Sequence, residues 1–187
     1  MKKLIKFNEH GHLLISITSF GLTGSEEIKR LEANSYGLTK EADCVLLNQS
    51  LFGYDTKHRL EKGTESKIVL IPNKDIPGVK SGYMIPNSRI EEYALSLKYR
   101  IPPAGIAPYL CTKDLFKELS SFDIPCILIF HEPIPGDRQY PYRLDAFKPC
   151  KISGSMNQPW PTCLGAMLAL PNCESNDLGA TAFLAPD

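Results

Sequence analysis

The stretch PCILIFHEPIPGDRQYPYRLDAF, from Pro125 to Phe147, decides the fold class of this chain. Its first part, residues 125–130, is a continuous apolar run typical of a strand that is buried on both faces. PIPG at residues 133–136 has the composition of a turn, and residues 142–147 resume an alternation of apolar and polar side chains. The stretch therefore predicts an antiparallel hairpin.

Four further stretches predict strands on either side of this hairpin. Each is rich in apolar or β-branched residues and is bounded by polar or turn-forming residues. A polar loop, GYDTKHRLEKG at residues 53–63, is expected to connect two of them as a solvated hairpin. The predicted strands are HLLISIT (12–18), DCVLLNQ (43–49), SKIVLIP (66–72) and ATAFLA (180–185).

Capping pairs predict where the helices begin. In such a pair a Ser or Thr side chain accepts a hydrogen bond from the backbone three residues on, and a Glu side chain there bonds back. Gly37 would suit a left-handed end of the first helix. Because the elements lack a strict βαβ rhythm, we expect the α+β class, with a mixed, largely antiparallel sheet and about three short helices. The pairs are Thr23 with Glu26 and Ser88 with Glu91, and Thr112 precedes the third helix.

Composition predicts a single globular domain over residues 1–187. Hydrophobic residues make up 43% and charged residues 22%, close to the averages for soluble proteins. Lys plus Arg and Asp plus Glu are both 21, so the formal net charge of zero gives no general attraction to nucleic acid or anionic lipid. We therefore expect neither a nucleic-acid partner nor a membrane partner.

The N-terminal residues and the cysteines indicate a cytoplasmic protein, with export by a signal-less route left open, and the prolines predict extended segments packed over the domain in the C-terminal third. The first residues lack the long apolar run of a secretory signal. The six cysteines include no close pair, which favours free thiols, although their even number leaves disulfides open. Most of the 15 prolines lie after residue 100, so the proline-rich, charge-poor last third is expected to be extended.

GLTGSEE, at residues 21–27, is the first candidate site. A strand followed by a glycine-containing turn and a capped helix start presents backbone amides at the positive end of a helix dipole, a geometry that binds phosphate. Gly24 would let an anion approach the backbone, and Thr23 and Ser25 would add hydroxyl donors. The competing interpretation is a simply capped helix, because two glutamates already occupy the favourable end of the dipole.

Two other stretches would support such a site. Lys57, His58 and Arg59 lie in the polar loop, where His58 is expected to be exposed and to have a pKa lowered by its cationic neighbours. His131 and Glu132 follow the apolar strand, and strand ends often carry functional groups. The leading hypothesis is a protein that binds, and as an enzyme would act on, a phosphate-bearing or otherwise anionic small ligand between the three stretches. His58 or His131 would then be the general acid or base, with Glu132 as its carboxylate partner.

Two alternatives stay open. Cys163, after a proline-rich loop, is expected in an exposed turn as the nucleophile of a hydrolase or transferase, with His131 as base and Asp137 or Asp145 as the orienting acid. Its competing interpretation is a small buried hydrophobe. The other alternative is a non-enzymatic interaction module whose C-terminal third contacts a protein partner. No cofactor can be named, and no metal site is expected, because His10 and His12 supply only two clustered ligands.

Overall fold

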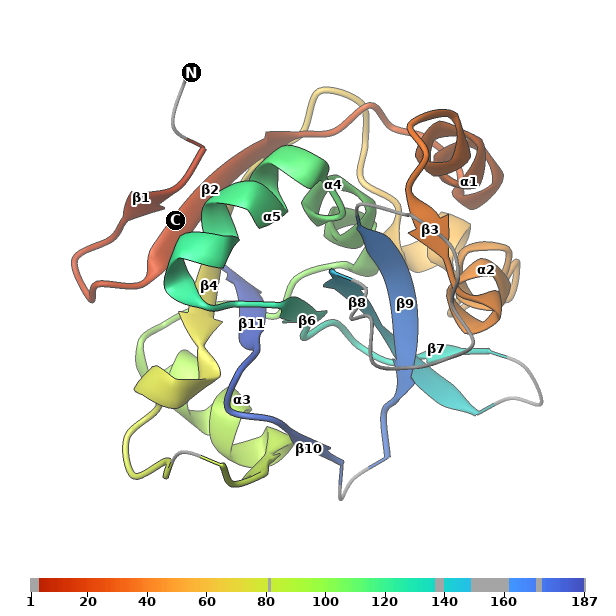
Figure 1. Ribbon diagram of the computed structural model, residues 1–187. Coiled ribbons are helices and arrows are strands. Elements are labelled where there is room, and N and C mark those ends of the chain that lie inside the picture. The colour runs from red at the N-terminus through yellow and green to blue at the C-terminus, as the bar shows by residue number, and fades with distance from the viewer. Residues whose placement is uncertain (1–3, 81, 137–139, 149–161, 171–172, 187) are drawn as a thin grey trace, which may run out of the picture.

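The computed structural model describes residues 4–80, 82–136, 140–148, 162–170 and 173–186. The described residues form a mixed sheet of nine strands and a separate ribbon of two, which with the helices confirms the α+β class (Figure 1). The strands are β1 (Lys6–Phe7), β2 (Leu13–Thr18), β3 (Gly37–Leu38), β4 (Glu65–Pro72), β5 (Ile85–Pro86), β6 (Cys126–Ile129), β7 (Ile134–Pro135), β8 (Pro141–Phe147), β9 (Cys163–Leu168), β10 (Glu174–Ser175) and β11 (Ala180–Leu184).

Helices are more numerous than the sequence indicated. The described ranges hold five α-helices rather than about three, and none of them is long and apolar enough to cross a bilayer. The helical elements are α1 (Gly24–Ala33), α2 (Lys40–Leu46), α3 (Asn87–Ser96), α4 (Ala107–Leu110), α5 (Lys113–Leu119), the π-helical turn η1 (Tyr54–His58), and the 3-10 turns η2 (Asn73–Asp75), η3 (Ala104–Ile106) and η4 (Ser120–Phe122).

The large sheet has the order β1-β2-β4-β11-β6-β8-β9-β3, with β7 also paired to β8. β6 and β8 pair antiparallel, and so do β7 and β8, which confirms the hairpin predicted for this stretch. β11 lies between β4, which it pairs antiparallel, and β6, which it pairs parallel. The last described strand of the sequence is therefore central in the sheet.

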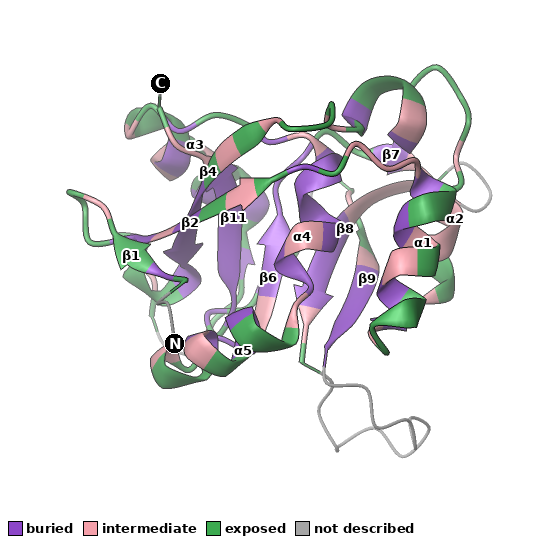
Figure 2. Ribbon diagram, turned by 90° about the horizontal axis from the view of Figure 1, so that it is seen from above, coloured by how far each residue is buried: buried purple, intermediate pink, exposed green. Residues whose placement is uncertain are grey.

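The two faces of the sheet bury separate apolar clusters. Ile68 and Leu70 of β4 point to the larger cluster, which α1, α2, α4 and α5 complete. Val69 and Ile71 point to the smaller cluster, which is covered by α3. Figure 2 shows α4 and α5 in front of the sheet and α3 behind it. Strands buried on both faces explain the continuous apolar runs of β4 and β6.

The predicted strand at 43–49 is wrong, because its apolar residues belong to α2. The Thr39 side chain accepts a hydrogen bond from Ala42 N and caps this helix, and Val45 and Leu46 are buried against the sheet. A short apolar run fits a buried helix as well as a strand, and periodicity alone does not separate them. The polar loop that follows therefore connects a helix to a strand.

Two helix boundaries also differ from the prediction. α1 ends before Ser35, which has the left-handed φ of 58°, whereas Gly37 pairs in β3. Asn87 begins α3 after Pro86 with no side-chain cap, so the Ser88 pair does not form. The described parts of the last third are extended strands and connections, and the prolines between residues 149 and 161 lie outside the described residues.

Close packing of α1 on α2 generates a stability prediction. A Cβ atom at Gly24 would lie 1.9 Å from the carbonyl oxygen of Leu46, which no real contact permits. Gly24→Ala is expected to lower the free energy of unfolding by roughly 3 kcal/mol or more, measured by urea denaturation. Lys29→Ala, on the exposed side of the same helix, is the control and should change it by less than about 0.5 kcal/mol. Equal midpoints for the two variants would contradict this packing.

Candidate functional site

The start of α1 is already occupied by a carboxylate of the protein. Thr23 and Glu26 form the predicted capping box. Gly24 N–H donates to Asp55 Oδ1 at 2.7 Å, so η1 supplies the negative charge that was expected from a ligand. Ser25 is exposed, with its hydroxyl 3.3 Å from that of Thr23. The local geometry is that of a capped helix whose anion position is filled internally.

The predicted loop and the predicted strand end do meet. The ammonium of Lys57 forms an ion pair with the Glu132 carboxylate, and this hydrogen bond holds the pKa of Glu132 below its ordinary value. Both side chains are exposed, so the pair contributes little to stability. Arg59 is exposed as well, and its charge adds to the hydrogen bonds from Thr23 that lower the pKa of Glu26.

His131 is locked as a neutral structural group. Its ring is fully buried, and Leu144 N–H donates to its Nε2 at 2.8 Å. The hydrogen therefore resides on Nδ1, which donates to the carbonyl oxygen of Glu132. Burial lowers the pKa of His131 to about 3. Because both ring nitrogens are engaged by backbone, the ring has no free nitrogen for a base.

His58 lies beside His131, with ring centroids 5.6 Å apart. Contrary to expectation it is buried, with 3% of its surface exposed. Ala104 N–H donates to its Nδ1 at 3.3 Å, so the neutral ring carries its hydrogen on Nε2. Burial, and then the charge of Lys57, lowers the pKa of His58, so the predicted direction is right although burial is the larger cause. In this arrangement His58 is a hydrogen-bond donor rather than a base.

Cys163 lies within β9 and is fully buried, so the expected exposed turn is wrong. Burial raises its pKa to about 11, and the charge of Asp145 acts in the same direction. A thiol with so high a pKa provides almost no thiolate at neutral pH. The loop at 157–161 and Asp137, which completed that hypothesis, lie outside the described residues.

The two N-terminal histidines pack with tyrosines. His12 is buried, and its Nδ1 lies 2.9 Å from the hydroxyl of Tyr99. Its ring centroid is 6.2 Å from that of His10. Across the described part of the chain, no group of three or more His, Cys, Asp or Glu residues is arranged to hold a metal ion.

A groove of about 600 Å³ crosses the sheet where β2 and β11 end and β4 begins, and no candidate from the sequence pointed to it. This volume lies within the range of small-ligand sites. The sequence does carry one indication of this groove: in SKIVLIP the polar residues Ser66 and Lys67 precede the fully buried part of β4. The groove is lined by Ser16, Ile17, Thr18, Leu60, Thr64, Glu65, Ser66, Lys67, Arg100, Pro103, Leu184, Ala185 and Pro186.

The groove presents unused hydrogen-bond donors. No described residue forms an ion pair or a hydrogen bond with the Lys67 ammonium. The same holds for the hydroxyls of Ser16, Thr18, Thr64 and Ser66. Arg100 is fixed at the rim because its backbone pairs with Leu184, and its guanidinium donates to Ala185 O at 3.4 Å. Two cations thus face one carboxylate, that of Glu65, among the described residues of the lining.

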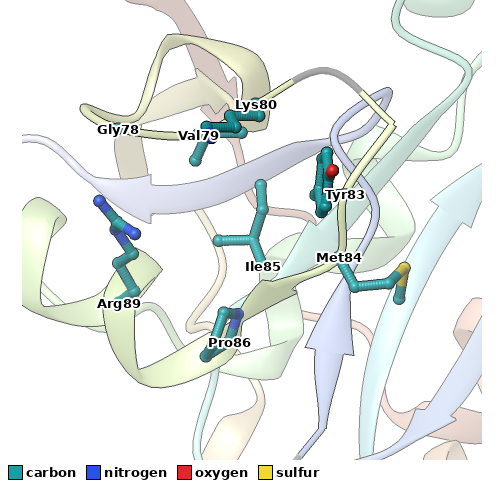
Figure 3. Close-up of a pocket in the computed structure, with 8 residues that line it drawn as sticks. All are labelled: Gly78, Val79, Lys80, Tyr83, Met84, Ile85, Pro86 and Arg89. Atoms are coloured by element: carbon teal, nitrogen blue, oxygen red, sulfur yellow. The ribbon is translucent and has the colours of Figure 1, made fainter.

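A second hollow, of about 170 Å³, lies beside α3 and β5 and has a different character (Figure 3). It is lined by two cations, Lys80 and Arg89, and Arg89 donates to Pro77 O at 2.6 Å across Gly78. Much of the remaining wall is apolar, with Val79 and Ile85 on its inner side. This hollow is smaller than the groove and its lining holds one hydroxyl group, that of Tyr83, so it provides fewer hydrogen-bond donors for an anion.

Comparison with protein families, with curated proteins and with solved structures finds no match for this chain. Function is therefore inferred from the side chains themselves.

The locked state of His131 generates a pH prediction. Its pKa in the folded state lies far below the value of about 6.5 in an unfolded chain. The unfolded state therefore binds a proton first, and the free energy of unfolding should fall as the pH drops below about 6.5, by up to roughly 1.4 kcal/mol per pH unit for this group. NMR should show the Nδ1–H tautomer with no titration of the His131 ring between about pH 8 and 4.5. A ring that titrates near pH 6 would contradict the burial and both hydrogen bonds.

Thiol reactivity tests the burial of Cys163. Iodoacetamide at neutral pH is expected to alkylate Cys163 only after unfolding in urea, because both access and thiolate are lacking in the folded state. Peptide mass spectrometry locates the label, with the partly exposed Cys44 and Cys173 as internal controls. Rapid, selective labelling of Cys163 in the folded protein would restore the nucleophile hypothesis.

Proposed function

We propose that this protein binds a small anionic ligand, of the phosphate-bearing kind, in the groove at the ends of β2 and β11 and the beginning of β4. The observation that carries the proposal is the Lys67 ammonium, which stands without a partner among the described residues inside a groove of about 600 Å³. Hydrogen bonds to charged groups contribute about 1.5–3 kcal/mol each, so one such contact changes affinity by a factor of ten or more.

Hydroxyl groups strengthen this interpretation. Ser16 of β2 pairs in register with Lys67 of β4, which sets the hydroxyl and the ammonium on one face of the sheet. Thr18 of β2 pairs with Glu65 and adds a second hydroxyl on that face, whereas Ser66 lines the groove from the opposite face of β4. Rotatable hydroxyl donors beside a cation suit the several acceptor oxygens of a phosphate or a polycarboxylate.

The groove adjoins the stretches that the sequence favoured. Leu60 of its wall follows His58 by two residues, and Pro103 precedes Ala104, whose N–H donates to the His58 ring. The anionic class of ligand predicted from the sequence is therefore kept, while the contacts proposed at Gly24, Lys57 and His131 are replaced. A protein partner for the C-terminal third stays a prediction, which is supported by exposed apolar side chains such as those of Leu168, Leu170 and Leu178.

A thermal-shift titration tests the proposal. Inorganic phosphate, nucleotides and nucleotide sugars are added at constant ionic strength, and a ligand at one hundred times its dissociation constant should stabilise the protein by about 2.7 kcal/mol. Lys67→Ala is expected to weaken that ligand by roughly tenfold or more. Ser16→Ala should have a smaller effect in the same direction.

Lys57→Ala is the matched control, because it removes a lysine that is already paired with Glu132. It should leave the ligand affinity unchanged. Loss of binding in Lys57→Ala with full binding in Lys67→Ala would move the ligand to η1 and overturn the groove. No shift with any of these ligands would overturn the anionic class.

A further inference from the structure

Buried polar side chains gather where η2, β10 and β11 begin. Asn73 and Thr181 are almost fully buried, and Thr181 Oγ1 donates to Asn73 Oδ1 at 2.8 Å. Asn73 Nδ2 in turn donates to Asn176 O at 2.8 Å. Ser175 is buried nearby, and its hydroxyl donates to Asn87 Oδ1 at 2.8 Å. Polar groups are costly to bury unless they are satisfied, so this network marks a place with a defined structure.

The network surrounds a cavity of about 40 Å³. Gly179 of the lining keeps it open, and Gly165, paired with Asp145 across the sheet, leaves room for the carboxyl group. A Cβ atom at Gly179 would lie 2.9 Å from Cys126 Sγ, and one at Gly165 would lie 2.6 Å from Asp145 Oδ1. The cavity exceeds the roughly 10–15 Å³ that a single water needs, yet it is too small for a whole metabolite. It suits the head group of a ligand.

Asp145 is the member of this lining that lacks a partner. It lies on β8 between Leu128 of β6 and Gly165 of β9, and 9% of its surface is exposed. Apart from its own backbone amide, no described residue donates a hydrogen bond to its carboxyl group. Burial without a counter-charge raises its pKa to about 7. A buried carboxyl group without a counter-charge is stabilised by a ligand that donates hydrogen bonds to it.

The other lining groups include several acceptors, beside the side-chain amide donors of Asn73 and Asn176. The hydroxyl hydrogen of Ser175 is committed to Asn87. Asn176 Oδ1 is an acceptor, since it receives Gly179 N–H at 2.9 Å. The sulfur atoms of Cys126 and Met167 complete the wall. Among these groups the unpaired carboxyl group of Asp145 carries the selectivity, and it favours an occupant with several N–H donors and a positive charge.

We propose that the Asp145 cavity binds the ammonium head of a protonated primary amine. The alkyl part of the ligand leaves between Met167 and Asn176, the two exposed residues of the lining. This site is separate from the groove, because it lies at the beginning of β11 and the groove lies at its end, about 13 Å along the strand. The proposal therefore does not depend on the anionic ligand.

Binding should tighten as the pH rises through about 7, because an ammonium pairs with the ionised carboxyl and lowers its pKa. The titratable groups near Asp145 are thiols: Cys126 on β6, Cys163 on β9 and Cys111, which follows α4. Burial raises their pKa values to about 11, 11 and 12, so they stay neutral in this range. Arg143, on the same strand and face, donates to His131 O at 2.8 Å and keeps its charge. Asp145 is thus the group that titrates with the ligand.

Methylammonium is the probe, and tetramethylammonium, which carries the charge without N–H donors, is the matched control. In the wild-type protein, methylammonium chloride should raise the melting temperature above the level given by the control at equal ionic strength. It should also lower the apparent pKa of Asp145, followed by the ¹³C shift of its carboxyl group. Asp145→Asn, which keeps the shape of the side chain, should reduce the affinity at least about tenfold.

Three results would overturn the proposal. Equal effects of methylammonium and tetramethylammonium would show a non-specific salt effect. Equal effects of methylammonium and potassium ion would assign the cavity to a bare monovalent cation. An Asp145 pKa that does not move when methylammonium is added would show that the cavity holds water alone, and this readout needs no variant.

Discussion

The pairing of β11 between β4 and β6 is the constraint on which the rest of the structure depends. β11 follows every other described strand in the sequence, yet it joins the β2–β4 half of the sheet to the β6–β8–β9 half. It pairs with β4 over five positions and with β6 over three. Ala180 and Ala182 face one apolar cluster and Phe183 faces the other, so this strand also links the two cores. During folding, the two halves of the sheet are not joined to each other until these long-range contacts form.

β11 also sets the chemistry at its two ends. At its beginning, Thr181 holds Asn73, and Gly179 leaves room for the cavity beside Asp145. At its far end, Leu184 pairs with the backbone of Arg100 and Ala185 N–H donates to Lys67 O, which shapes the groove. The groove presents unused hydroxyl donors and the Lys67 ammonium, whereas the cavity presents acceptors and a carboxyl group. One central strand thereby positions a site suited to an anion at one end and a site suited to a cation at the other.

Local chemistry made much of the fold predictable. Thr23 with Glu26 and Thr112 cap helices where expected, and the run around Cys126–Ile129 is a strand paired to β8. The predictions were wrong where the local sequence is compatible with two structures and tertiary packing decides between them. The apolar residues of 43–49 became α2 because they pack on the sheet, and Cys163 is buried because β9 lies between β8 and β3. The spacing of residues in the sequence predicts neither the packing of α2 nor the position of β9 in the sheet.

The candidate site was predictable in part. The sequence grouped Lys57, His58 and Glu132, and the structure does bring them together. It did not reveal that Asp55 fills the α1 start or that backbone groups occupy both nitrogens of His131. Lys67 and Asp145 escaped notice as ligand contacts because the residues that line the groove and the cavity with them come from segments remote in sequence. A lone lysine or aspartate in a strand carries no local mark of a site.

Backbone amide NMR, recorded during separate titrations with inorganic phosphate and with methylammonium, tests the central claim most directly. The account predicts that phosphate shifts the amides of Ser16, Ser66 and Lys67, and that methylammonium shifts those of Asp145, Gly179 and Ala180. Phosphate shifts confined to Gly24–Glu26, or amine shifts spread evenly over the molecule, would contradict it.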